Sequence, residues 1–198
     1  PAYFNEDYVE STLFLYISAG ITTVRGMLGY DRQLELKQKV ANGDYIGPHL
    51  YLAGPSFNGN SVKSPEQARA KVVKQVEEGW DLLKIHPGLS MADYRAMAEM
   101  ANELGIRFGG HVPEAVGIEE AINLGQETMD HIDGYVAYLN AFEGAELNSK
   151  MAEIIQKTLD NAVWIVPTQA LWETIIGAAD YDAMANYDEL KYIPLSVR

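Results

Sequence analysis

The chain has 198 residues and a formal net charge of −13, and 47% of its residues are hydrophobic. A chain of this length can bury one substantial core, and its acidity argues against nucleic acids and anionic membranes as partners, because both require clustered lysine and arginine. The sequence has no cysteine, which excludes disulfides, thiolate metal ligands and a cysteine nucleophile and leaves the cellular compartment open.

Short apolar segments recur along the chain, and each is followed by a segment with the periodicity of a helix. The six predicted strands span residues 21–24, 49–53, 82–86, 106–111, 128–132 and 163–167. They are too short and too uniformly apolar for a clean alternation of faces, which is typical of parallel strands buried on both faces. No apolar run approaches the roughly 20 residues that a membrane-spanning helix needs.

The segments between the strands carry signals for the start and the end of a helix. In the sequence Ser64-Pro65-Glu66-Gln67, serine is a predicted N-cap, and Gly79 marks the end of that helix. Ser90 and Asp93 predict the start of the next helix, which ends before Gly105. Further helices are expected over residues 7–19, 32–42, 118–124 and 148–159.

Strands that alternate with helices predict a parallel sheet with right-handed crossovers, here in one α/β domain over residues 1–198. Lys84, His111 and His131 lie at or near the ends of three consecutive strands, where barrel enzymes carry their functional side chains. A doubly wound sheet usually has a glycine-rich phosphate loop after its first strand, and this sequence has neither G-x-G-x-x-G nor a Walker A motif. We therefore expect a parallel (β/α)8 barrel of the TIM type, incomplete in this chain.

His111 and His131 are candidate metal ligands. Their separation, 131 − 111 = 20 residues, is enough for a short helix and the next strand, so the two imidazoles are expected side by side. Neutral imidazole is the commonest protein ligand of zinc. A single histidine at a strand end is more often a packed, hydrogen-bonded residue, but two on neighbouring strands favour a site.

Lys84 stands inside an apolar strand, where an ammonium group is costly unless it is paired, modified or ligating. Three explanations remain open: an ion pair with a carboxylate, a Schiff-base lysine of lowered pKa, or a carbamate that bridges two metal ions. Only the carbamate also gives both histidines a role. His86, which would share the strand face of Lys84, and His49, at the start of its strand, are interpreted as structural.

Six stretches together resemble the metal-dependent amidohydrolases, in particular the branch of prolidase-like and imidazolonepropionase-related enzymes. They are GITTVR at 20–25, GPHLYLAG at 47–54, LKI at 83–85, GHVP at 110–113, DH at 130–131 and VPT at 166–168. Each piece is weak alone, but the six occur in the order of the family and cover nearly the whole chain.

The resemblance implies that the chain corresponds to strands two to seven of a (β/α)8 barrel. Lys84 would then be the carboxylated bridging lysine and a catalytic residue, and His111 and His131 would be ligands of divalent metal, most simply zinc, with two ions in the complete enzyme. The implied activity is hydrolysis of a peptide-like or cyclic amide bond by a metal-bound hydroxide. Tyr135 could hydrogen-bond the substrate carbonyl as a second catalytic residue, although a packing role is favoured.

The sequence also departs from the family. The His-x-His pair of the first strand and the aspartate of the eighth are not in the chain, and Gly26 stands where the family often has an acid. We therefore expect this chain to be inactive as a fragment. Two alternatives are an aldolase-like barrel that forms a Schiff base through Lys84 and a non-catalytic truncated scaffold. The expected partner is a small amide or dipeptide, without nucleic acid or membrane, and a homo-oligomer is left open.

Overall fold

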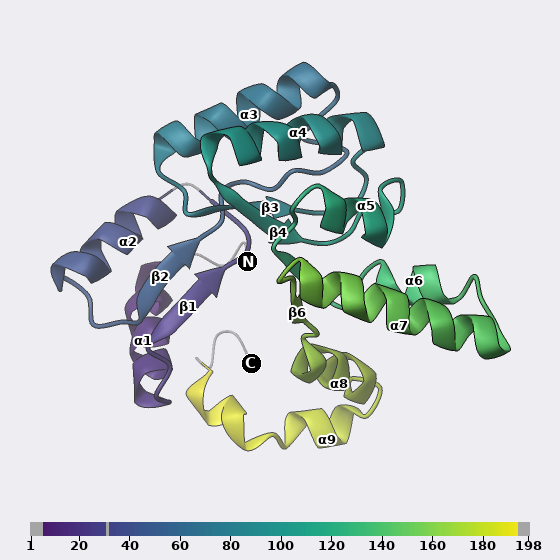
Figure 1. The fold of residues 1–198 in the computed structure, drawn as a ribbon. Coiled ribbons are helices and arrows are strands. Elements are labelled where there is room, and N and C mark those ends of the chain that lie inside the picture. The colour runs from purple at the N-terminus through teal and green to yellow at the C-terminus, as the bar shows by residue number, and fades with distance from the viewer. Residues whose placement is uncertain (1–5, 31, 194–198) are drawn as a thin grey trace.

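The computed structural model describes residues 6–30 and 32–193, and within them short strands alternate with helices (Figure 1). The strands are β1 (Thr23–Gly26), β2 (His49–Leu52), β3 (Leu82–Ile85), β4 (Arg107–Gly110), β5 (Thr128–Asp130) and β6 (Trp164–Val166). Every strand pairing is parallel. All six predicted strands are confirmed, with ends that differ by one or two residues.

The helices are α1 (Glu6–Ser18), α2 (Gln33–Asn42), α3 (Pro65–Glu78), α4 (Met91–Leu104), α5 (Gly117–Asn123), α6 (Tyr135–Leu139), α7 (Gly144–Asp160), α8 (Gln169–Gly177), α9 (Tyr181–Ala185) and the 3₁₀ helix η1 (Asp188–Tyr192). The predicted caps of α3 and α4 are confirmed, because the side chains of Ser64 and Ser90 accept hydrogen bonds from the backbone N–H groups of Gln67 and Asp93. α6, α8, α9 and η1 were not predicted from the sequence.

The strands follow one another in chain order, which distinguishes a barrel wall from a doubly wound sheet. One sheet has the order β1-β2 and the other β3-β4-β5-β6. Two parallel bridges, Ala53 to Leu82 and Phe57 to Ile85, join the sheets. Between these two bridges the segment after β2 spans 57 − 53 = 4 residues, whereas β3 spans 85 − 82 = 3. The segment after β2 therefore contains one extra residue, which forms a bulge. A doubly wound sheet would reverse its order at a switch point, and the described strands do not.

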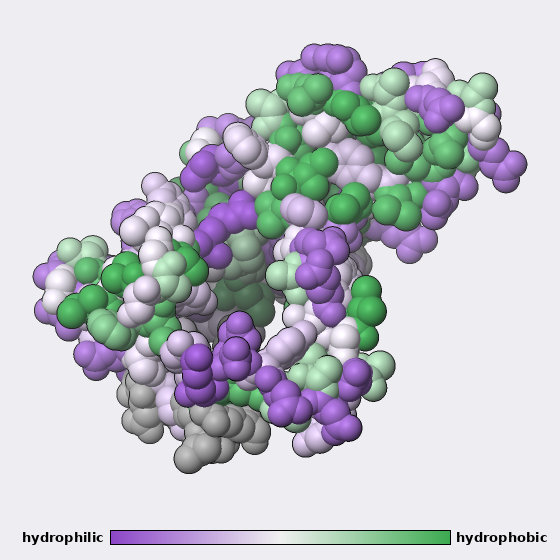
Figure 2. All heavy atoms as spheres, turned by 90° about the horizontal axis from the view of Figure 1, so that it is seen from below, coloured by the Kyte–Doolittle hydropathy of each residue, from purple (hydrophilic) through white to green (hydrophobic). Residues whose placement is uncertain are grey.

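The helices α3 and α4 pack on each other and cover β3 and β4 from outside (Figure 1). The main core includes Leu83, Met97 and Phe108. Seen from below, the molecule is hollowed near its centre (Figure 2). On β6, Trp164 is 70% exposed. Within the described part of the chain, no helix is long and apolar enough to cross a bilayer.

Candidate functional site

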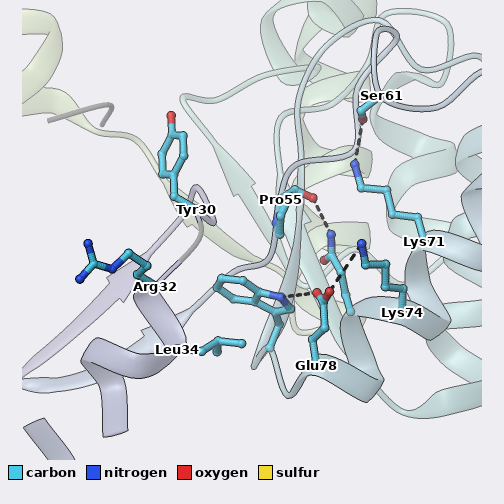
Figure 3. Close-up of a pocket in the computed structure, with 10 residues that line it drawn as sticks. Tyr30, Arg32, Leu34, Pro55, Ser61, Lys71, Lys74 and Glu78 are labelled. Carbon is cyan, nitrogen blue, oxygen red and sulfur yellow. Dashed lines mark hydrogen bonds and ion pairs between the residues drawn. The ribbon is translucent and has the colours of Figure 1, made fainter. Parts of the chain in front are cut away.

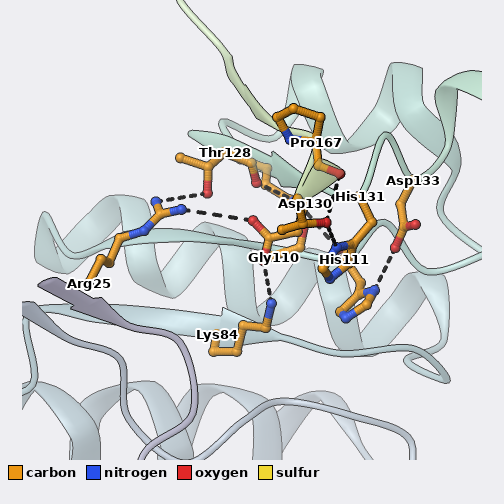
Figure 4. A network of polar contacts seen from close by, with 11 residues as sticks. Arg25, Lys84, Gly110, His111, Thr128, Asp130, His131, Asp133 and Pro167 are labelled. Atoms are coloured by element: carbon orange, nitrogen blue, oxygen red, sulfur yellow. Dashed lines mark hydrogen bonds and ion pairs between the residues drawn. The ribbon is translucent and has the colours of Figure 1, made fainter. Parts of the chain in front are cut away.

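The three candidate metal ligands gather at the carboxyl ends of β3, β4 and β5 (Figure 4). The rings of His111 and His131 have centroids 4.7 Å apart. The side chain of Lys84 crosses above Gly110, the residue before His111. The fold therefore places together all three residues that the sequence singled out, whereas their roles stay predictions.

Gly110 makes this crossing sterically feasible. Its φ is +129°, a region that side chains rarely adopt, and a Cβ atom there would lie 2.4 Å from the Ile85 carbonyl oxygen and 2.9 Å from Lys84 Nζ. Only glycine leaves that volume to the lysine amine. The close approach of backbone at this strand end is thus a packing requirement of Lys84.

The amine of Lys84 forms an ion pair with Asp130, the last residue of β5. Nζ and Oδ2 are 2.5 Å apart, and the two residues are only 3% and 4% exposed. Arg25 lies on the far side of the same carboxylate, with Nη2 3.9 Å from Oδ1, and its Nη1 donates to Thr128 Oγ1. Of the three explanations for a lysine in this strand, an ion pair is therefore present. Asp130 had entered the sequence argument only as a neighbour of His131.

Both histidines are oriented through Nδ1. His111 Nδ1 lies 2.5 Å from Asp133 Oδ2 and donates to it, because a carboxylate only accepts. His131 Nδ1 lies 2.5 Å from Thr168 Oγ1, whose own proton goes to the Pro167 carbonyl, so the imidazole is again the donor. In the neutral rings the lone pair is therefore on Nε2.

This arrangement is the one expected around a metal, where ligating histidines donate their second ring nitrogen to a carboxylate or hydroxyl group. Burial lowers the pKa of His111, opposed by its hydrogen bond to Asp133, and so favours the neutral ring that a metal needs. The described residues include no group of three histidine, aspartate or glutamate side chains arranged to hold a metal ion. The orientation of the two histidines thus fits a metal.

Backbone strain is concentrated beside the histidines. His131 and Ile132 have φ values of 61° and 63°, and Thr168 has 51°. Left-handed backbone is uncommon for residues other than glycine and is an outlier for β-branched ones. Such strain persists where the surrounding structure imposes it, which is common at functional sites.

His86 extends the pair into a row of three imidazoles. Its ring centroid lies 5.1 Å from that of His111. Burial, and next the charge of Lys84, lower its pKa to about 4. Its Nδ1 is buried and has no hydrogen-bond partner among the described residues. The sequence interpretation of His86 as structural assigned it no such position.

Tyr135 and His49 lie apart from this row. The hydroxyl group of Tyr135 is buried and 2.8 Å from Thr158 Oγ1 of α7, which is the packing arrangement favoured for it. Burial raises its pKa. His49 is exposed at the start of β2 and contacts the Tyr51 ring.

A separate hollow of about 540 Å³ lies between α2 and α3 (Figure 3). Its lining includes Tyr30, Lys71 and Trp80. Burial, and next the charge of Lys74, lower the pKa of Lys71 to about 8. None of its lining residues belongs to the row of imidazoles, so this hollow is not part of the candidate site.

No protein-family model and no curated protein sequence matches the chain. Solved structures do. The ochratoxinase of A. niger has a TM-score of 0.66 at 18% identity over 84% of this chain and 46% of its own. A Xaa-Pro dipeptidase with bound methionine gives 0.65 at 18% identity, over 86% and 48%. The bottromycin amidohydrolase gives 0.60 at 20% identity, over 74% and 35%.

The chain spans less than half the length of each of these structures. At such identities the likeness is one of fold. It agrees with the parallel strands in chain order and with the gathering of polar side chains at their carboxyl ends. The chain has the fold of part of the β/α barrel found in amidohydrolase structures.

Proposed function

We propose that the chain is part of a metal-dependent hydrolase of amide bonds, in which Nε2 of His111 and of His131 bind divalent metal, most simply zinc. The observation that carries the proposal is the pair of imidazoles 4.7 Å apart, each donating through Nδ1 to a fixed acceptor. Asp133 and Thr168 would set the orientation of the rings, and mutation of such partners typically weakens metal affinity about 10–100-fold.

Lys84 is proposed as the third ligand after its neutral amine has added carbon dioxide and released a proton to give a carbamate. Carboxylation requires a neutral amine. Lys84 must therefore first lose the proton that its Nζ donates to Asp130 Oδ2, 2.5 Å away. Asp130 is the nearest acceptor for that proton, and it becomes a neutral carboxyl group when it takes it. The ion pair and the carbamate are thus two states of one buried lysine.

Divalent metal would supply a Lewis acid and an activated water at the top of the barrel. In this proposal His111 and His131 bind the metal, and Gly110 leaves room for Lys84. Asp133 and Thr168 fix the tautomers of the two histidines. The proposed substrates are peptide-like or cyclic amides, including dipeptides. A Xaa-Pro dipeptidase is among the similar folds, which supports that substrate class.

The test uses the full-length protein. Metal content and hydrolysis of a panel of dipeptides and N-acyl amino acids are compared in the wild type and in the His111→Asn and His131→Asn variants. Each variant should lose metal and at least about 100-fold in kcat. His49→Asn, at the exposed end of β2, is the matched control and should keep both. Equal metal content in all four proteins, or a lysine adduct trapped by borohydride with a carbonyl substrate, would contradict the proposal.

A further inference from the structure

A second hollow, of about 520 Å³, opens directly beside the row of imidazoles. His86 forms one side of it, and the same ring lies 5.1 Å from His111 on its other side. Leu28, Ser56 and Asn60 are among the other lining residues. The hollow therefore adjoins the proposed metal ligands through a single side chain.

The walls of this hollow are two loops that are fixed by backbone contacts. After β2, the chain pairs again with β3 through hydrogen bonds from Phe57 N to the Lys84 carbonyl and from His86 N to the Phe57 carbonyl, both 2.8 Å. At Gly59 the loops touch: a Cβ atom there would lie 2.3 Å from the Gly88 carbonyl oxygen. The hollow is thus shaped before any ligand enters.

The first loop is also tied to α3. Lys71 Nζ donates to the Ser56 carbonyl at 2.6 Å and to Ser61 Oγ at 2.9 Å. Asn58 Oδ1 accepts hydrogen bonds from the backbone N–H groups of Asn60 and Ser61, so this oxygen is already bonded within the loop. Among the described residues, Nδ1 of His86 is enclosed by the protein and has no hydrogen-bond partner, and no hydrogen bond holds the exposed side-chain amide of Asn60.

The charge of the lining selects among ligands. No aspartate, glutamate, lysine or arginine lines the hollow. An ionised group that entered it would lose hydration, and the nearest ammonium groups, those of Lys63 and Lys71, are already bonded to the carbonyl oxygens of Gly59 and Ser56. A neutral amide would exchange hydrogen bonds with water for hydrogen bonds with the protein. A side chain of the asparagine or glutamine type matches both the polarity and the neutrality of the lining.

We propose that this hollow is a substrate subsite which takes an uncharged, hydrogen-bonding side chain next to the scissile amide bond, and that His86 and Asn60 contact it. The inference rests on the proposed hydrolase function and adds to it a substrate class and two specificity-determining residues. It makes His86 a substrate contact instead of a structural residue.

The first experiment compares isosteric substrates in the full-length, metal-loaded protein. Dipeptides with asparagine or aspartate, at each of the two positions in turn, differ in charge and hardly in size. At one position the wild type should prefer asparagine by about tenfold or more in kcat/KM, because the lining offers hydrogen bonds and no counter-ion. His86→Phe and Asn60→Ala should each reduce that ratio at least threefold. His49→Phe is the control and should leave it unchanged.

A second readout does not depend on turnover. In protein labelled with ¹⁵N-histidine, the His86 signal is assigned by its disappearance in His86→Phe. Propionamide should shift that signal in a saturable way, and propionate should shift it much less. A shift by neither probe, or by both equally, overturns the subsite, as does an asparagine preference that His86→Phe leaves intact. If propionamide binds at His86 but no amide is hydrolysed, the subsite stands and the proposed hydrolase function fails.

Discussion

The ammonium group of Lys84 lies 2.5 Å from the carboxylate of Asp130, and both residues are almost completely buried. Two opposite charges removed from water stabilise each other, and removal of either one leaves the other buried without a counter-ion, which strongly destabilises the fold. In the proposed function the same pair would control the carboxylation of Lys84, because the amine has to become neutral first.

We predict that Asp130→Asn destabilises the chain by about 3–5 kcal/mol, because it leaves the Lys84 charge buried without a counter-ion. The double variant Lys84→Met/Asp130→Leu should recover much of that loss, since it removes both charges together. Urea unfolding followed by circular dichroism measures both. A double variant as unstable as Asp130→Asn alone would show that the pair is not the source of the cost.

Lys84→Ala should abolish binding of two metal ions by the full-length protein, and short carboxylic acids should restore part of the activity. A free carboxylate can replace the bridging oxygens of a carbamate, whereas it cannot replace an amine that forms a Schiff base. Metal analysis and activity with and without added acetate or propionate provide the measurement. Reduced stability with unchanged metal stoichiometry would leave the ion pair as the only role of Lys84.

Gly110→Ala should cost about 2–4 kcal/mol, because a strained φ and an overpacked Cβ add. The matched control is Gly43→Ala: its φ of +82° is also left-handed, but a Cβ there meets nothing within 4 Å. The difference between the two variants in urea unfolding reports the steric conflict with Lys84 and Ile85 together with the less accessible φ of Gly110. Equal losses would mean that Lys84 does not occupy the space above Gly110.

Lys71 gives the stability of the chain a pH dependence outside the candidate site. Its pKa is about 8 in the folded chain and 10.5 as the ordinary value, so between these limits the unfolded chain binds more protons. Below pH 8 the cost of burying the charge is fully present, and it is relieved as the pH rises towards 10.5.

Wild-type stability, measured relative to Lys71→Met, should therefore rise between pH 8 and pH 10.5. Lys157→Met removes the same charge from α7 and serves as the control for general charge effects. Thermal unfolding of the three proteins across this pH range tests the expectation. A difference between the wild type and Lys71→Met that does not change with pH would contradict the lowered pKa.

Much of the fold could be predicted from local sequence. The strands were visible as apolar segments, and the starts of α3 and α4 depend on serine side chains three residues from the groups they cap. The partners of the site could not be predicted in this way. Asp130 is 46 residues from Lys84, Asp133 is 22 from His111 and Thr168 is 37 from His131. Such contacts arise only when the strand ends meet.

The unpredicted helices α6 and α8 illustrate the same limit. α8 follows a left-handed Thr168, which is no standard N-cap geometry, and α6 follows Gly134 without a side-chain cap. The same limit holds for His86: its position two residues after Lys84 was known, but its neighbour His111 comes from another strand.

The consecutive left-handed residues His131 and Ile132 have a consequence for engineering. A β-branched residue in this conformation costs of order 1–2 kcal/mol, so Ile132→Gly or Ile132→Asn would be an easy gain in heat tolerance. The same change would loosen the turn that aims the His131 ring at Thr168. Under the proposed function, variants at position 132 would therefore separate the two properties: the relaxed backbone should raise stability, and the looser turn before Thr168 should lower turnover.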